Sequence, residues 1–147
     1  HGNVLIWEVY TMKKLILAAA CLALSATTAS ATLYSCSVQE QGSRSGWVPP
    51  TVLVAVRDDG VVFVSDPIGA AIAGEPAEAA VLNDSGQSLS VRWQVRGALS
   101  ATNQYAHFFY TAIIDKNRGS IRVRAKPKGY SNQFNGTGRC QVGEIPS

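Results

Sequence analysis

Residues 88–96 read SLSVRWQVR, and this stretch decides the fold class. Leu, Val, Trp and Val stand at every second position, and the residues between them are Ser, Arg and Gln. An alternation with a period of two is typical of a β-strand with one face buried and the other in water. The segment therefore predicts a strand whose Trp93 face belongs to a hydrophobic core.

Alternating segments on both sides of this strand predict two β-hairpins. Residues 120–126 alternate Ile, Val and Ala with Arg and Lys, and they follow the apolar run 105–114 across the turn KNRG. Residues 51–57 and 61–65 flank the turn DDG. A glycine in each turn supplies the positive φ that short hairpin loops often require.

The remaining segments complete the pattern. Short strands are expected at 33–38 and 79–83, and a loop with one helical turn is expected over the alanine-rich residues 69–80. The tail, 127–147, is rich in Gly, Asn and Ser, so we expect it to be irregular except at 139–141. About seven strands joined by short turns predict an all-β antiparallel meander, closing as a small barrel or folding as a two-layer sandwich.

A segment typical of an export signal precedes this domain. Met12 is followed by two lysines, an apolar run at 15–24 and the small residues Ala29-Ser30-Ala31. These are the n-region, the h-region and the A-x-A cleavage site of a signal peptide at 12–31. We expect cleavage after Ala31, which leaves residues 32–147 as one β domain in the periplasm or secreted from the cell.

Other interpretations of this segment stay open. A transmembrane anchor requires about 20 apolar residues, about twice the length of this run. A buried helix has no reason to end in a peptidase site, and a lipoprotein would carry its lipid on Cys21 after a shorter h-region. Residues 1–11 do not begin with Met, and we interpret them as a remnant upstream of the true start.

Two of the three cysteines remain after the predicted cleavage, Cys36 near the start of the domain and Cys140 near its end. An even number of cysteines in an oxidising compartment predicts a disulfide, and two unpaired buried thiols are the alternative. A metal site is not expected, because the chain has no C-x-x-C pair and His107 is the single histidine of the domain. Nothing in the sequence indicates a cofactor.

The expected domain carries 11 Lys+Arg and 9 Asp+Glu, and its cations are concentrated at 116–128, where no acid occurs. Strand spacing places Arg122, Arg124 and Lys126 on one face. This candidate face suits an anionic partner such as lipopolysaccharide, an acidic polymer or an acidic protein patch. The alternative is a solvated strand face that blocks edge pairing.

Three segments are apolar on both faces, namely 51–56, 61–64 and 106–114. A cavity for an apolar ligand or a subunit interface would explain this pattern. Apolar surface alone is poor evidence for a site, so we expect the loop at 66–80 and the tail to cover the second face.

His107 is the candidate for catalysis, but no G-x-S-x-G, H-E-x-x-H or comparable motif surrounds it. A histidine needs a nucleophile and an orienting acid beside it to act as a catalyst. We therefore predict no catalytic residues, with a small hydrolase that uses His107 as an alternative.

Five segments carry a resemblance to a known group: YSC, GWVP, VSDP, SVRWQV and KGYSNQFNGTGRC. The chain resembles small exported, disulfide-containing β-proteins of unknown function from Gram-negative bacteria over most of residues 34–140. The resemblance implies paired cysteines and a β architecture, and it supplies no catalytic residues. A looser architectural similarity, resting on Cys36, Cys140 and the number of strands, is to periplasmic lysozyme inhibitors, whose inhibitory loop pattern is not found here.

These observations predict an exported, non-enzymatic binding protein. Its expected partner is an anionic envelope component or another protein; nucleic acid and stable membrane insertion after cleavage are not expected. The alternatives are a periplasmic protein like the lysozyme inhibitors and a small hydrolase.

Overall fold

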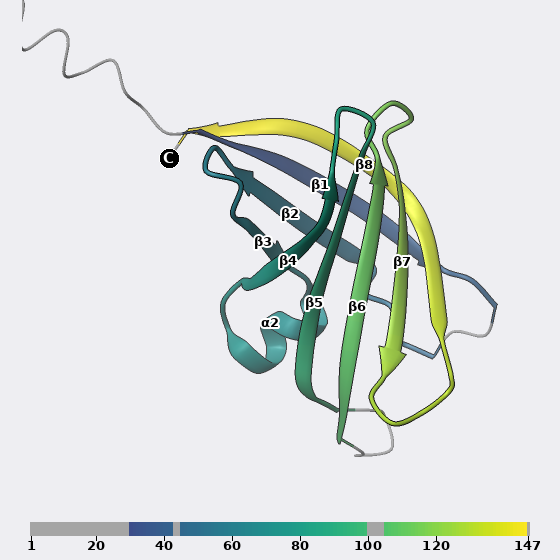
Figure 1. Cartoon of the computed structure of the whole chain (residues 1–147). Helices are drawn as coiled ribbons and strands as arrows, with labels where there is room; N and C mark the ends of the chain where they lie inside the picture. Colours follow the sequence, from purple (N-terminus) through teal and green to yellow (C-terminus); the bar gives the residue numbers. More distant parts are fainter. Residues whose placement is uncertain (1–29, 43–44, 100–104, 147) are drawn as a thin grey trace, which may run out of the picture. The chain divides into compact units, whose positions relative to one another are not determined.

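A closed antiparallel barrel forms the fold in the computed structural model, which describes residues 30–42, 45–99 and 105–146. Each strand pairs with the next one along the chain, and β8 closes the barrel beside β1 (Figure 1). The predicted all-β meander is confirmed, as a barrel and not a sandwich. Its elements in chain order are β1 (Ser30–Glu40), β2 (Thr51–Arg57), β3 (Val62–Ser65), α2 (Pro67–Ala73), β4 (Ala77–Asp84), β5 (Ser88–Leu99), β6 (Tyr105–Asp115), β7 (Ser120–Pro127) and β8 (Phe134–Pro146).

The tail differs from the expectation. The sequence predicts an irregular tail except at 139–141, but β8 runs through most of it as a continuous strand and brings the number of strands to eight in the described residues. The apolar alternation that marks the other strands is interrupted here, because the positions of β8 opposite Val123 and Ile121 are Gly136 and Gly138. Their partners on β7 are fully buried, so the two glycines stand where side chains would face the core.

The structure does not describe the N-terminal part of the sequence. This part contains residues 12–29 of the predicted signal peptide, including Cys21, and the upstream segment 1–11. Ser30 and Ala31 are the first residues of β1. Within the described residues, no helix has the length and apolar character needed to cross a membrane.

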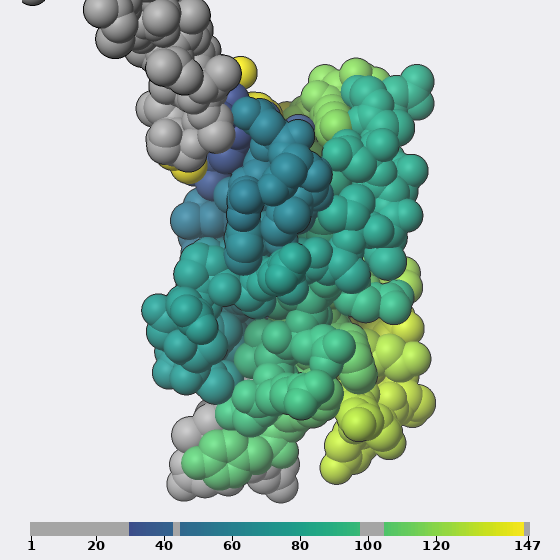
Figure 2. Space-filling view, turned by 60° about the vertical axis from the view of Figure 1, so that its left-hand side comes forward, coloured from purple at the N-terminus to yellow at the C-terminus, as the bar shows by residue number. Residues whose placement is uncertain are grey.

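Alternate residues of the strands fill the barrel. Leu89, Val91, Trp93 and Val95 of β5 are all buried, as their spacing predicts, and large rings from β6 pack beside them. On the face that Figure 2 shows, the colours pass from blue through teal to green, so segments that follow one another in the sequence lie side by side there. The fully buried large side chains are Trp93, Tyr110, Phe108, Leu89, Ile114, Ile121, Val52, Val54, Val62, Val64, Val91 and Val123.

The outer faces of β2 and β6 are open to solvent in places. Leu53 is 41% exposed and Ile113 is 36% exposed. The expectation that the loop at 66–80 and the tail cover these faces is therefore wrong at both positions. The reason is that α2 packs mainly on β5, and the tail completes the barrel wall instead of lying across it.

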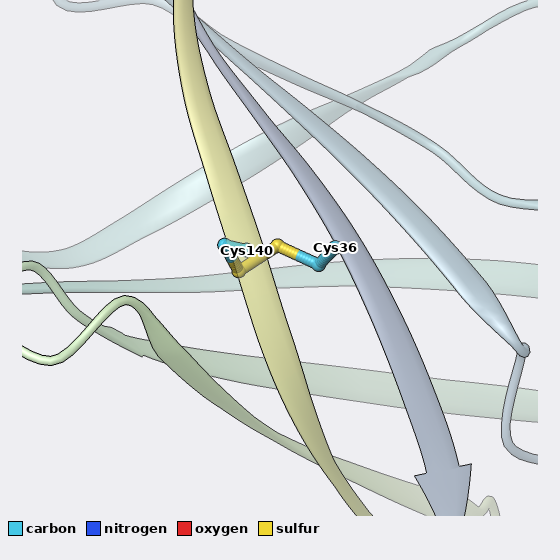
Figure 3. The surroundings of a disulfide bond; sticks show 2 residues. All are labelled: Cys36 and Cys140. Atoms are coloured by element: carbon cyan, nitrogen blue, oxygen red, sulfur yellow. A yellow bond between two sulfur atoms is a disulfide. The ribbon is translucent and has the colours of Figure 1, made fainter.

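β1 and β8 meet at a close seam that a disulfide crosses. Cys36 of β1 and Cys140 of β8 are bonded, with their Cα atoms 4.0 Å apart, as the even cysteine count predicts (Figure 3). The backbones approach so closely that a Cβ atom at Gly138 would overlap the carbonyl oxygen of Ser37. Glycine at this position thus allows the barrel to close.

α2 is attached to the barrel through a buried carboxylate. Asp66 is the N-cap of α2, where one carboxylate oxygen accepts a hydrogen bond from Gly69 N–H at 2.8 Å. The other oxygen accepts from the indole Nε1–H of Trp93 at 3.1 Å, and Asp66 is only 5% exposed. A buried polar group must be hydrogen-bonded, and this carboxylate satisfies a helix end and a core indole together.

Tyr110 is held in the core by a second polar contact. Its hydroxyl donates a hydrogen bond to the carbonyl oxygen of Trp47 at 2.7 Å. Burial raises the pKa of Tyr110, and repulsion from Asp66 and Glu40 raises it further.

Candidate functional site

The three predicted basic side chains lie in a row on the outer surface of β7. Arg122, Arg124 and Lys126 are exposed, and the residues between them point into the core. Successive outward positions on a strand are about 6.6–6.8 Å apart, so the three positions span about 13 Å. The predicted alternation of this strand is therefore present.

Arg92 of β5 lies on the same outer surface as this row, two strands away from it. It pairs with Thr111 of β6, and Thr111 pairs with Arg124 of β7. Three neighbouring strands lie about 4.8 Å apart each, so Arg92 and Arg124 face outward about 10 Å from one another.

Two more cations extend the row at its end. Lys128 follows β7, and its N–H donates a hydrogen bond to the carbonyl oxygen of His107 on β6 at 2.7 Å. Arg96 is the next exposed residue of β5 after Gln94. The sequence placed these arginines of β5 on a polar face but gave no strand order to connect them with β7. We name the six residues the basic face: Arg92, Arg96, Arg122, Arg124, Lys126 and Lys128.

The cations of the basic face are not neutralised by carboxylates. Within the described residues, no member of the basic face forms an ion pair. The ion pairs found there lie in or beside turns and join Arg57 to Asp59 (2.7 Å), Lys116 to Asp84 (2.8 Å) and Arg118 to Asp115 (4.0 Å). The basic face is therefore a local concentration of positive charge on a domain whose total charge is nearly balanced.

Uncharged side chains of β6 lie between the two rows of cations. His107 stacks on Phe109 with ring centroids 4.8 Å apart, and its Nε2 is 3.0 Å from Oε1 of Gln94. With an amide oxygen as acceptor, Nε2 carries the proton of the neutral ring. Partial burial lowers the pKa of His107, and the positive charges of Arg96 and Lys128 lower it further.

Three adjoining hollows follow β7 along this surface. One of about 430 Å³ contains Phe109, Arg124 and Lys126, and a second of about 270 Å³ shares Arg124 with it. A third of about 550 Å³ shares Arg122 with the second. Because neighbouring hollows share lining residues, we treat them as one elongated depression and name it the β7 groove.

A separate pocket of about 260 Å³ lies between α2 and β5. Its lining is mainly apolar and includes Trp93, Val95 and Ile72. The carboxylate of Asp66 also lines it, but both of its oxygens are used in the contacts with Gly69 and Trp93. Within the described residues, no buried side-chain nitrogen or oxygen lacks a hydrogen-bond partner, and this includes those that line the pocket.

The surroundings of His107 bear on the predicted catalytic alternative. Its side-chain contacts are an amide and a phenyl ring. Within the described residues, His107 has no hydrogen bond to a carboxylate, and no group of three or more His, Cys, Asp or Glu residues is arranged to hold a metal ion.

Comparisons with known proteins returned no match: no family model, no curated protein and no solved structure matches the chain.

Proposed function

We propose that the protein is an exported, non-enzymatic binding protein that holds an anionic partner on its basic face. The observation that carries the proposal is the set of six cations on β5, on β7 and directly after β7, on either side of β6, without a carboxylate partner among the described residues. The signal-peptide pattern at 12–31 and the Cys36–Cys140 bond fit a role outside the cytoplasm.

The position of β7 in the barrel argues against a purely protective role for its charges. Lysine and arginine often protect the free edge of a sheet from pairing with another chain. β7 has no free edge, because it pairs with β6 on one side and with β8 on the other. Its cations therefore need another explanation, and binding of an anion supplies one.

The repulsion within the basic face is modest but unfavourable. Two unit charges about 6.7 Å apart in water repel by about 0.6 kcal/mol, and less at physiological ionic strength. An anion that contacts several of the cations removes this repulsion and adds attraction. The same charge distribution also accelerates the encounter with an anionic partner.

A panel of three polyanions tests the proposal: polygalacturonate, polyphosphate and oligothymidylate. The mature protein should bind at least one of them, with affinity that falls as salt rises. A lysine or arginine beside an anionic surface contributes about 1 kcal/mol. The double variant Arg122→Gln/Arg124→Gln should therefore bind about 30-fold more weakly.

The matched control is Arg57→Gln/Lys116→Gln. It removes the same charge from two cations that lie off the basic face and already form ion pairs. If the control loses as much affinity as the double variant on β7, net charge and not the basic face is responsible. If the wild-type protein binds none of the three polyanions, the proposed function is wrong.

A further inference from the structure

We propose that the partner is a linear acidic polysaccharide, a chain of sugars bearing carboxylates that lies along the β7 groove. This inference rests on the proposed function and names the chemical class of the ligand. Three features of the groove carry it: its length, its mixture of polar groups and its apolar wall.

The length of the groove favours an extended ligand. The three hollows follow one another along β7 and are joined through Arg124 and Arg122. The cations that line them repeat at every second residue of the strand. A compact anion would fill one hollow, whereas a linear polymer reaches all three and contacts several cations at once.

The polar groups in the groove suit a ligand that has hydroxyls as well as charges. Arg124 is flanked across the sheet by Thr111 on β6 and Asn135 on β8, and Arg122 is flanked by Thr137 on β8. Each arginine can form a bidentate pair with a carboxylate, and the hydroxyl and amide groups beside it can exchange hydrogen bonds with neighbouring hydroxyls. Carboxylates and hydroxyls side by side are the functional groups of a uronic acid.

The apolar wall of the groove suits a sugar ring better than a nucleobase. Phe109 lines the hollow that contains Arg124, while His107 does not line it. One face of the Phe109 ring is covered by the stacked His107 ring, which leaves a single partly buried ring and no series of open platforms for successive bases. A C–H face of a sugar can pack on such a wall.

The limited apolar exposure of the groove argues against an acyl chain. Among the residues that line the groove, Ile113 is the exposed large hydrophobic side chain, at 36%. Stable binding to a membrane by a protein surface needs a larger apolar area in addition to positive charge. The wall is therefore suited to packing against a ligand in water.

The same three polyanions, compared at equal concentrations of charge, test this inference by titration calorimetry with the mature protein. Polygalacturonate should bind most tightly, polyphosphate supplies charge without sugar, and oligothymidylate supplies charge with bases. Phe109→Ala should weaken polygalacturonate binding about fivefold to tenfold and leave polyphosphate binding within about twofold. Thr111→Val keeps the side-chain shape and removes the hydroxyl. It should also weaken the binding of polygalacturonate and leave the binding of the other two polyanions unchanged.

Phe63→Ala is the matched control, since Phe63 is a half-buried outward phenylalanine of β3, away from the groove. Unchanged circular dichroism spectra of the variants would exclude loss of fold. If all three polyanions bind according to charge alone and Phe109→Ala has no effect, the inference is overturned and the proposed function stands. Tightest binding of oligothymidylate would overturn it in favour of nucleic acid. If nothing binds, both fail.

Discussion

Replacing Gly138 with alanine would test how β8 closes the barrel on β1. Besides overlapping the carbonyl oxygen of Ser37, the added Cβ would lie 2.7 Å from the carbonyl carbon of Ser37 and 3.0 Å from Cα of Val38. Carbon atoms in favourable contact are about 3.5–4.0 Å apart, so the two strands would have to separate by at least about 1 Å, and further to clear the carbonyl oxygen of Ser37. Every obstacle is a backbone atom, so no change of side-chain rotamer can relieve the overlap.

The expected loss of stability is large for the addition of one methyl group. Adding a methyl to a packed core costs about 1–3 kcal/mol where side chains can move aside. At Gly138 the backbone itself must move and the pairing of β1 with β8 must stretch, so we expect a loss of about 3 kcal/mol or more. A small domain has about 5–15 kcal/mol of stability in total, so the variant should remain folded but unfold at markedly lower urea.

Urea unfolding followed by tryptophan fluorescence measures this loss, and Gly143→Ala provides the control. Gly143 lies in the same strand, and an added Cβ there meets nothing within 4 Å. Gly143→Ala should change the free energy of unfolding by less than about 1 kcal/mol. A Gly138→Ala variant as stable as Gly143→Ala would refute the close approach of the two strands.

Four further predictions concern the disulfide, the helix cap and two titrating groups. Replacing Cys36 and Cys140 with serine removes a link between residues separated by 104 positions and should lower the stability to urea by up to about 4.7 kcal/mol, as should reduction of the wild type. Asp66→Ala removes a helix cap and leaves an indole N–H without an acceptor, so it should cost about 2–4 kcal/mol in the same assay, with partial recovery in Asp66→Asn. Burial and two nearby carboxylates raise the pKa of Tyr110, so the folded protein keeps a proton that the unfolded chain releases above about pH 10. Stability should therefore fall as the pH rises above 10, and less steeply in Tyr110→Phe. The pKa of His107 is lowered by partial burial and by two neighbouring cations, so below about pH 6.5 its protonation adds charge to the basic face. Polyanion binding should then tighten on acidification, but not in His107→Gln, and an NMR titration with and without polyanion should show the ligand raising this pKa.

The strands that sequence predicts well are those whose inward positions carry apolar side chains. Residues 88–96 and 120–126 alternate clearly, and both lie within strands of the barrel. β8 escaped prediction because its inward positions at 136 and 138 are glycines, which interrupt the apolar alternation between Phe134 and Cys140. Hydrophobic periodicity detects strands whose inward side chains fill the core. It does not detect a strand whose inward glycines let the backbone approach its neighbours closely.

Only the part of the basic face that lies on the single strand β7 could be predicted from the sequence. Arg122, Arg124 and Lys126 share a face because of strand spacing, which the sequence contains. That Arg92 belongs to the same face depends on the order and register of β5, β6 and β7, which are set by contacts between distant residues.

The inward positions of β7 must pack in the core, whereas its outward positions are in contact with water. Ile121, Val123 and Ala125 are buried and hold the strand in the barrel, so the fold constrains them. The outward positions need only tolerate water, and β-branched residues such as threonine suit an exposed strand position better than lysine. Three consecutive outward positions nevertheless carry cations that repel one another on a strand without a free edge. The mutual repulsion of these cations lowers the stability of the barrel slightly, which supports the proposal that the basic face binds an anion.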